Sequence, residues 1–173
     1  MRSTKGFSLI ELLIVVAIIL IIAAIAIPNL LQARIAANEA SAVGSLSAIK
    51  SGEVAYDTAY PTVGFSPDIA SLGGASPCTP SSATACLLDS FLSSSVPGTG
   101  GKSGYVYLAT GIVPPGAINN AAFVAAAAPV LAHSTGNHDY CSTNDGVLRS
   151  QLANPGDAPV NALAPCLAFP VAQ

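Results

Sequence analysis

The chain has 173 residues, of which 51% are hydrophobic and only 9% are charged, and its formal net charge is −3 at pH 7. This length fits one domain and one long additional element. So weak a charge identifies no partner, and the six scattered basic residues form no basic patch, so no specific nucleic-acid partner is expected.

The N-terminus combines a short basic start with a long apolar run. Arg2 and Lys5 precede residues 7–27, which are apolar except for Ser8 and Glu11. As a helix this stretch would be about 30 Å long at ~1.5 Å per residue, which is enough to cross the hydrocarbon core of a bilayer. The basic start predicts a cytoplasmic N-terminus, with the remainder of the chain crossing the membrane.

Two ordinary interpretations leave part of this pattern unexplained. A cleaved secretory signal peptide fits "AIA" at 24–26, but the apolar run is long for such a peptide and an acid precedes it. A plain single-span anchor explains the length, but a carboxylate at mid-bilayer would cost about 2.5–3.5 kcal/mol, and less near the headgroups. A better interpretation has to account for Glu11 as well as for the length.

The stretch "KGFSLIELLIVVAIILIIAAIAIPNLLQAR" resembles the N-terminal signature of class III prepilins, the type IV pilins and the pseudopilins of type II secretion. The matching residues are Gly6, Phe7, Glu11 and Pro28, with an unbroken apolar run between the last two. The resemblance implies a leader of residues 1–6, cleavage by a prepilin peptidase between Gly6 and Phe7, and N-methylation of Phe7. It also implies that Glu11 meets the terminal amine of a neighbouring subunit as a filament grows.

Removal of the leader would give Glu11 a chemical partner. The new amine of Phe7 has an ordinary pKa near ~8, so it is largely protonated at neutral pH. In apolar surroundings an unpaired carboxylate and an unpaired ammonium are each costly, and pairing offsets much of that cost. A buried ion pair fixes the alignment of neighbouring subunits more reliably than it adds stability. We therefore expect Glu11 and the Phe7 amine to form an assembly contact between subunits.

The helix is predicted to continue past Pro28 and to end before "YPTVG" at 60–64. Pro28 removes one helical hydrogen bond and is expected to kink or locally melt the helix near residues 24–27. Beyond it, an apolar stripe with helical period is predicted to pack against a globular head. Its members are Leu31, Ile35, Ala42, Leu46, Ile49 and Tyr56. The expected parts of the chain are the leader 1–6, a transmembrane or filament-core helix 7–27, an amphipathic helix 28–58 and a head 59–173.

The head is predicted to be loop-rich at first and β-rich afterwards. Its expected elements are a short helix at 83–94, strands at 104–110 and 120–132, a hairpin over 138–150 that turns at "NDG" (144–146), and an irregular tail from 151. The predicted class is therefore α+β, with one long helix packed on an antiparallel sheet of three or four strands. This is the pilin fold that the resemblance implies.

Four cysteines follow the export-type N-terminus: Cys78, Cys86, Cys141 and Cys166. They form no C-x-x-C pair and have no histidine at a ligand spacing, so a zinc site is not expected. An even number predicts two disulfides in an oxidising compartment. Of the three possible connectivities, Cys78–Cys86 with Cys141–Cys166 is favoured because both pairs are close in sequence. The second pair also resembles the C-terminal disulfide loop of many type IV pilins.

The chain offers no convincing catalytic, cofactor or metal site. "VPGTGGKS" at 96–103 has valine where a phosphate-binding loop needs glycine, and a predicted strand follows it. His133 and His138 are interpreted as polar loop residues, since no partner motif accompanies them. The aspartates of the head fit no calcium-loop pattern.

The sequence thus predicts a structural protein without catalytic activity or cofactor. It is expected to be a subunit, the major pilin, of a type IV pilus-like filament with a role of the adhesion or motility kind. Expected partners are other copies of itself, the prepilin peptidase and the assembly machinery of the bacterial cytoplasmic membrane. The chain would lie in that membrane before assembly and in the extracellular pilus afterwards. A type II secretion pseudopilin and a membrane-anchored or secreted binding domain are the alternatives.

Overall fold

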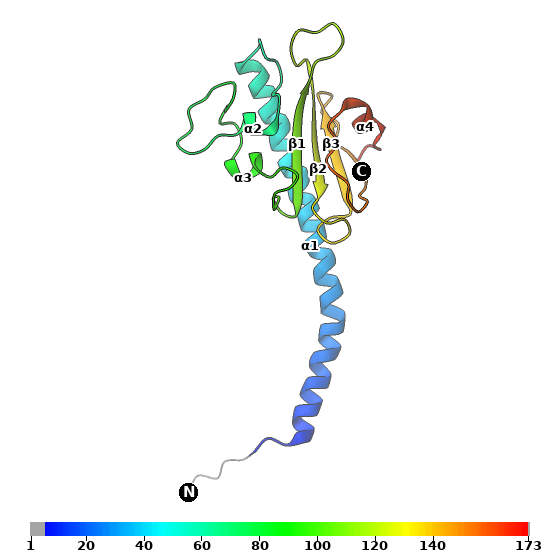
Figure 1. Ribbon diagram of the computed structural model, residues 1–173. Helices are drawn as coiled ribbons and strands as arrows, with labels where there is room; N and C mark the ends of the chain where they lie inside the picture. Colours follow the sequence, from blue (N-terminus) through cyan, green and yellow to red (C-terminus); the bar gives the residue numbers. More distant parts are fainter. Residues whose placement is uncertain (1–5, 173) are drawn as a thin grey trace. The chain divides into compact units, whose positions relative to one another are not determined.

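The computed structural model describes residues 6–172. Its elements are α1 (Leu9–Ala59), α2 (Ile69–Leu72), α3 (Ser90–Ser93), β1 (Tyr105–Ile112), β2 (Ala122–Pro129), β3 (His138–Thr143), β4 (Arg149–Leu152) and α4 (Leu163–Ala168) (Figure 1). The chain divides into two compact units that meet between Arg34 and Ile35, within α1. Each unit is described by itself.

The first unit is the N-terminal part of α1, and it is helical without interruption through Pro28. The local melting predicted near residues 24–27 is therefore wrong. A proline removes only one backbone donor, and the residues around it keep their helical conformation. Leu31, predicted to face the core, is 49% exposed, because the buried face of α1 begins only at Ile35.

The second unit starts with the rest of α1, whose buried face confirms the remainder of the predicted stripe. Ile35, Ala42, Leu46, Ile49 and Tyr56 are all buried. This face also buries three residues that the apolar stripe did not include: Ser45, Gly52 and Glu53. The buried face is therefore wider than the stripe, and it contains a carboxylic acid.

The sheet has four antiparallel strands in the order β1-β2-β3-β4. Every residue of the central strand β2 is buried, and four consecutive alanines, 125–128, allow layers to pack closely on both faces. On one face, Ala125 and Ala127 join the core that includes the buried side chains of α1. On the other, Val124 and Ala126 pack with Cys166 and Phe169. The α+β class is as predicted, and the segment containing α4 adds a third layer to the predicted helix and sheet (Figure 1).

Two predicted local structures differ from the structure. The helix expected over 83–94 is limited to α3, because Asp89 caps its start by accepting a hydrogen bond from the Leu92 N–H at 2.8 Å. The tail expected to be irregular contains α4, which includes Pro165. Proline is tolerated there because the first turn of a helix has backbone positions that need no intrahelical donor. The hairpin of β3 and β4 is confirmed.

Candidate assembly segment and disulfide-bonded head

Glu11, the acid at the start of the apolar run, lies in the first turn of α1. The Ser8 backbone N–H donates to Glu11 Oε2 at 3.1 Å, and the Leu12 N–H donates to the Ser8 carbonyl at 3.2 Å. This is one half of a capping box, S-x-x-E, and the helix dipole favours an anion at this end. Glu11 therefore has a partner within its own chain. This capping role was not among the expected roles of Glu11, although the spacing of Ser8 and Glu11 predicts it.

The Gly6–Phe7 bond precedes the helix. Both residues are outside regular secondary structure and exposed, and the Phe7 side chain is 83% accessible. Apart from its chain neighbours, no described residue has an atom within 4 Å of the position a Cβ would take on Gly6. This is the open backbone that a peptidase needs. Arg2 and Lys5, the basic residues of the expected leader, lie outside the described residues.

Phe7 and the part of α1 up to Leu31 present an apolar surface of large exposed side chains. Its members are Phe7, Leu9, Ile10, Leu12, Leu13, Ile14, Val15, Val16, Ile18, Ile19, Leu20, Ile21, Ile22, Ile25, Ile27, Leu30 and Leu31. By length and composition α1 is able to cross a membrane. A surface this apolar requires cover by lipid or by other protein. Pro28 lies at the end of this surface, inside the helix.

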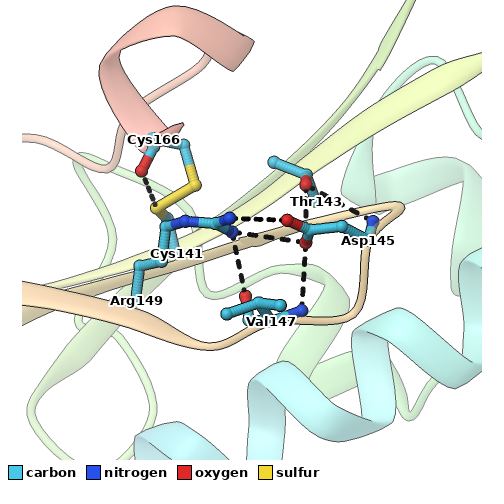
Figure 2. Close-up of a disulfide and its surroundings, with 6 residues drawn as sticks. All are labelled: Cys141, Thr143, Asp145, Val147, Arg149 and Cys166. Carbon is cyan, nitrogen blue, oxygen red and sulfur yellow. Dashed lines mark hydrogen bonds and ion pairs between the residues drawn. A yellow bond between two sulfur atoms is a disulfide. The ribbon is translucent and has the colours of Figure 1, made fainter. Parts of the chain in front are cut away.

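Both predicted disulfides are present, and no free cysteine occurs among the described residues. Cys78–Cys86 closes a loop between α2 and α3. Cys141–Cys166 is fully buried and joins β3 to α4 across 25 residues (Figure 2). The second bond therefore attaches the C-terminal segment to the face of the sheet opposite α1.

Beside this disulfide, an ion pair orders the β3–β4 turn (Figure 2). Arg149 contacts both carboxylate oxygens of Asp145, at 2.6 and 3.2 Å. Asp145 also accepts hydrogen bonds from the Thr143 hydroxyl at 2.8 Å and the Val147 N–H at 3.0 Å. The Arg149 guanidinium and these donors hold the pKa of Asp145 well below its usual range. The predicted "NDG" turn is thus fixed by a side-chain network.

A second polar contact joins α1 to the loop before β3. Glu39 Oε1 accepts from the Asn137 N–H at 2.7 Å and lies 3.1 Å from His138 Nδ1. Asn38 donates to the Thr135 carbonyl at 2.9 Å. His138 was expected to lie in a loop, but it is the first residue of β3, where it contacts Glu39 of α1.

The described residues contain no cluster of three or more metal-ligating His, Cys, Asp or Glu side chains. The 96–103 stretch forms turns before β1, and Lys102 lies 3.6 Å from Asp89. His133 occupies the turn after β2 with a φ of 63°.

Two buried acids were not anticipated. Glu53 on α1 is fully buried, and burial raises the pKa of its carboxyl to about 7. Asp139 on β3 is 4% exposed, and burial raises its pKa to about 6. No sequence pattern identifies them, because charged residues on amphipathic elements are normally at the surface.

A known sequence family matches the N-terminal segment described above. Residues 1–27 match the family model of the prokaryotic N-terminal methylation motif. The chain thus carries the N-terminal signature of type IV pilins, on a pilin-like α+β fold.

One curated relative matches more specifically. The chain is 69% identical over 39 residues to the type IV wide pilus major component PilA4 of Thermus thermophilus. The match spans 22% of this chain and 30% of that protein, so most of the chain lies outside it. No solved structure matches the chain significantly.

Proposed function

We propose that this chain is the major structural subunit of a type IV pilus-like filament. The observation that carries the proposal is the exposed apolar surface between Phe7 and Leu31, which lies largely within the methylation motif and contains a single carboxylate, Glu11. The similarity to a protein named as a major pilus component supports the assignment. The protein has a structural role and no catalytic activity of its own.

The proposed mechanism is the one implied by the resemblance to type IV pilins, and the methylation motif and the apolar helix support it. The chain first lies in the cytoplasmic membrane, with its N-terminus on the cytoplasmic side. A prepilin peptidase then cleaves the exposed Gly6–Phe7 bond, and Phe7 is methylated. The assembly machinery of that membrane moves subunits into a filament, in which the apolar helices exchange lipid for one another. The heads form the filament exterior and make its adhesion or motility contacts.

Within this mechanism Glu11 has two successive partners. Before assembly its carboxylate accepts a hydrogen bond from the Ser8 N–H of its own chain. During assembly it pairs with the Phe7 amine of a neighbouring subunit, so that neither charge remains unpaired among apolar helices.

Two substitutions of Glu11 separate its two roles. Glu11→Ala removes the cap and the charge, whereas Glu11→Gln keeps an oxygen that accepts from Ser8 but removes the charge. We expect both variants to lose most surface filaments, counted by electron microscopy, while the subunit remains in the membrane. Normal filament numbers in Glu11→Gln would show that the charge is not used, and normal numbers in Glu11→Ala would contradict the mechanism altogether.

A further inference from the structure

A buried acid in the head has its hydrogen bonds but no counter-charge. Glu53 is 0% exposed; its Oε2 accepts from the Ser66 N–H at 2.8 Å and its Oε1 from the Ser66 hydroxyl at 2.7 Å. Among the described residues no Lys, Arg or His forms an ion pair with it. A buried carboxylate without a cation is costly. A neutral carboxyl avoids this cost: its carbonyl oxygen still accepts from the Ser66 N–H, and its O–H donates to the Ser66 hydroxyl oxygen.

Glu53 fixes a short segment, Val63–Ser66, to α1. That segment is joined in turn to Asn120, in the loop between β1 and β2. The Phe65 N–H donates to the Asn120 carbonyl, the Asn120 N–H to the Val63 carbonyl, and the Asn120 side-chain amide to the Phe65 carbonyl, each at 2.9 Å. One side chain on α1 therefore determines the position of two surface segments that are far apart in sequence.

The titratable groups around Glu53 do not stabilise its anion. Burial is the main cause that raises its pKa to about 7, and the negative charge of Asp68 acts in the same direction. Tyr56, on the same helix, is neutral at these pH values because burial raises its pKa as well. The two hydrogen bonds from Ser66 oppose the effect of burial without cancelling it.

We propose that Glu53 is a pH-dependent anchor for the segment Val63–Ser66. Below neutral pH the protonated carboxyl holds this segment and Asn120 against α1. At neutral pH and above, the ionised carboxylate favours water, and the segment opens away from α1 more often while the sheet stays folded. The exposed loop between β1 and β2, which carries the fully exposed Ile118, becomes mobile with it. The head surface thereby has two states with different order.

The direction of the effect follows from the two protonation equilibria. When the segment is released, Glu53 regains its ordinary pKa of 4.5, against about 7 when it is held. Release therefore becomes more favourable as the pH rises from 4.5 to 7, and it gains nothing further above 7. Each pH unit in this range contributes close to a factor of ten, so the opening equilibrium rises by up to about 300-fold.

Amide hydrogen exchange of the full-length chain in detergent micelles tests the anchor. After correction for intrinsic rates, we expect the opening constant for the Phe65 and Asn120 amides to rise by roughly two orders of magnitude between pH 5 and pH 8. The Tyr107 amide, bonded to the Ser95 carbonyl at 2.7 Å, should show no such rise.

Two variants complete the test. Glu53→Gln cannot ionise and should show a pH-independent opening constant, whereas Asp57→Asn, one turn further along the same helix, should behave as wild type. A flat profile in the wild-type chain overturns the proposal even if Glu53→Gln fails to fold. A rise in Glu53→Gln equal to that of the wild type overturns it too. The readout does not require filaments, so it is independent of the proposed assembly function.

Discussion

At the scale of single residues, three acids of the head have pKa values shifted in opposite directions. Asp145 is paired with Arg149, and its lowered pKa means that it stabilises the fold at pH values above its ordinary range and loses this contribution in acid. Glu53 and Asp139 are buried, and burial raises their pKa values. They therefore favour the folded state in acid, and this contribution is lost as the pH rises and they ionise. The head is therefore expected to lose stability as the pH rises from about 4 to 7.

Asp139 permits a direct test of this pH dependence. Its Oδ1 has no donor among the described residues, its Oδ2 receives only a 3.4 Å contact from Gln151, and the carboxylate of Asp157 lies within hydrogen-bonding reach. Asp139→Asn supplies a donor and removes the charge. We expect the free energy of unfolding to rise by on the order of 1–2 kcal/mol at pH 8 and to change little at pH 4. Urea unfolding followed by near-ultraviolet circular dichroism measures both values; equal effects at the two pH values would contradict the account.

Gly136 tests the packing of the loop before β3. A Cβ on this residue would lie 2.0 Å from the Tyr105 hydroxyl oxygen, whose hydrogen bond to the His138 carbonyl is 2.9 Å long. We expect Gly136→Ala to destabilise the head by about 1–3 kcal/mol, because the tyrosine has to move. The matched control is Gly44→Ala on α1, where no described residue outside the adjacent helix backbone has an atom within 4 Å of the new Cβ. That substitution should stabilise the helix by roughly 0.5–1 kcal/mol, and a similar loss in both variants would be inconsistent with local packing.

At the scale of elements, the two disulfides are expected to act on different parts of the head. Cys141–Cys166 spans 25 residues and is fully buried, while Cys78–Cys86 spans eight residues and is partly exposed. Loop-closure entropy predicts a loss of about 3.5 kcal/mol when the first is replaced by a pair of serines and about 2.5 kcal/mol for the second. Replacement of Cys141 and Cys166 should also increase hydrogen exchange in α4. Unchanged exchange in α4 would mean that the bond does not hold this helix.

The elements that sequence predicted well are those with a strong local pattern. α1 has its helical period, and the β3–β4 hairpin has the "NDG" turn. The strand β2 was correctly preferred over a helix despite its alanines, and the disulfide pairing followed from the spacing of the cysteines. These features depend on near neighbours along the chain.

The features that sequence did not predict depend on distant contacts. The burial of Glu53 depends on Ser66, and that of Asp139 on the tertiary packing of β3. α4 is a six-residue helix without a side-chain cap, so local sequence carries little signal for it. The Ser8–Glu11 contact is different, because it is local and its S-x-x-E spacing is present in the sequence. Candidate assembly residues could thus be found from sequence, but the buried acids of the head could not.

At the scale of the whole molecule, the chain consists of an apolar helical unit and a disulfide-bonded α+β head. The first unit exposes the apolar side chains of residues 7–31, and the second has a core of its own. A chain of this composition requires cover for its first unit and an oxidising compartment for its second. A filament subunit exported from the cytoplasmic membrane meets both requirements.

The mass and N-terminal sequence of the subunit, taken from filaments sheared off the cell surface, test this account most directly. We expect a chain that begins at Phe7, carries one additional methyl group and contains two intact disulfides. A chain that begins near Ile27 and is found free in the medium would be an ordinary secreted domain. A chain that keeps Met1 would be a plain membrane anchor, and either result would contradict the assignment as a pilus subunit.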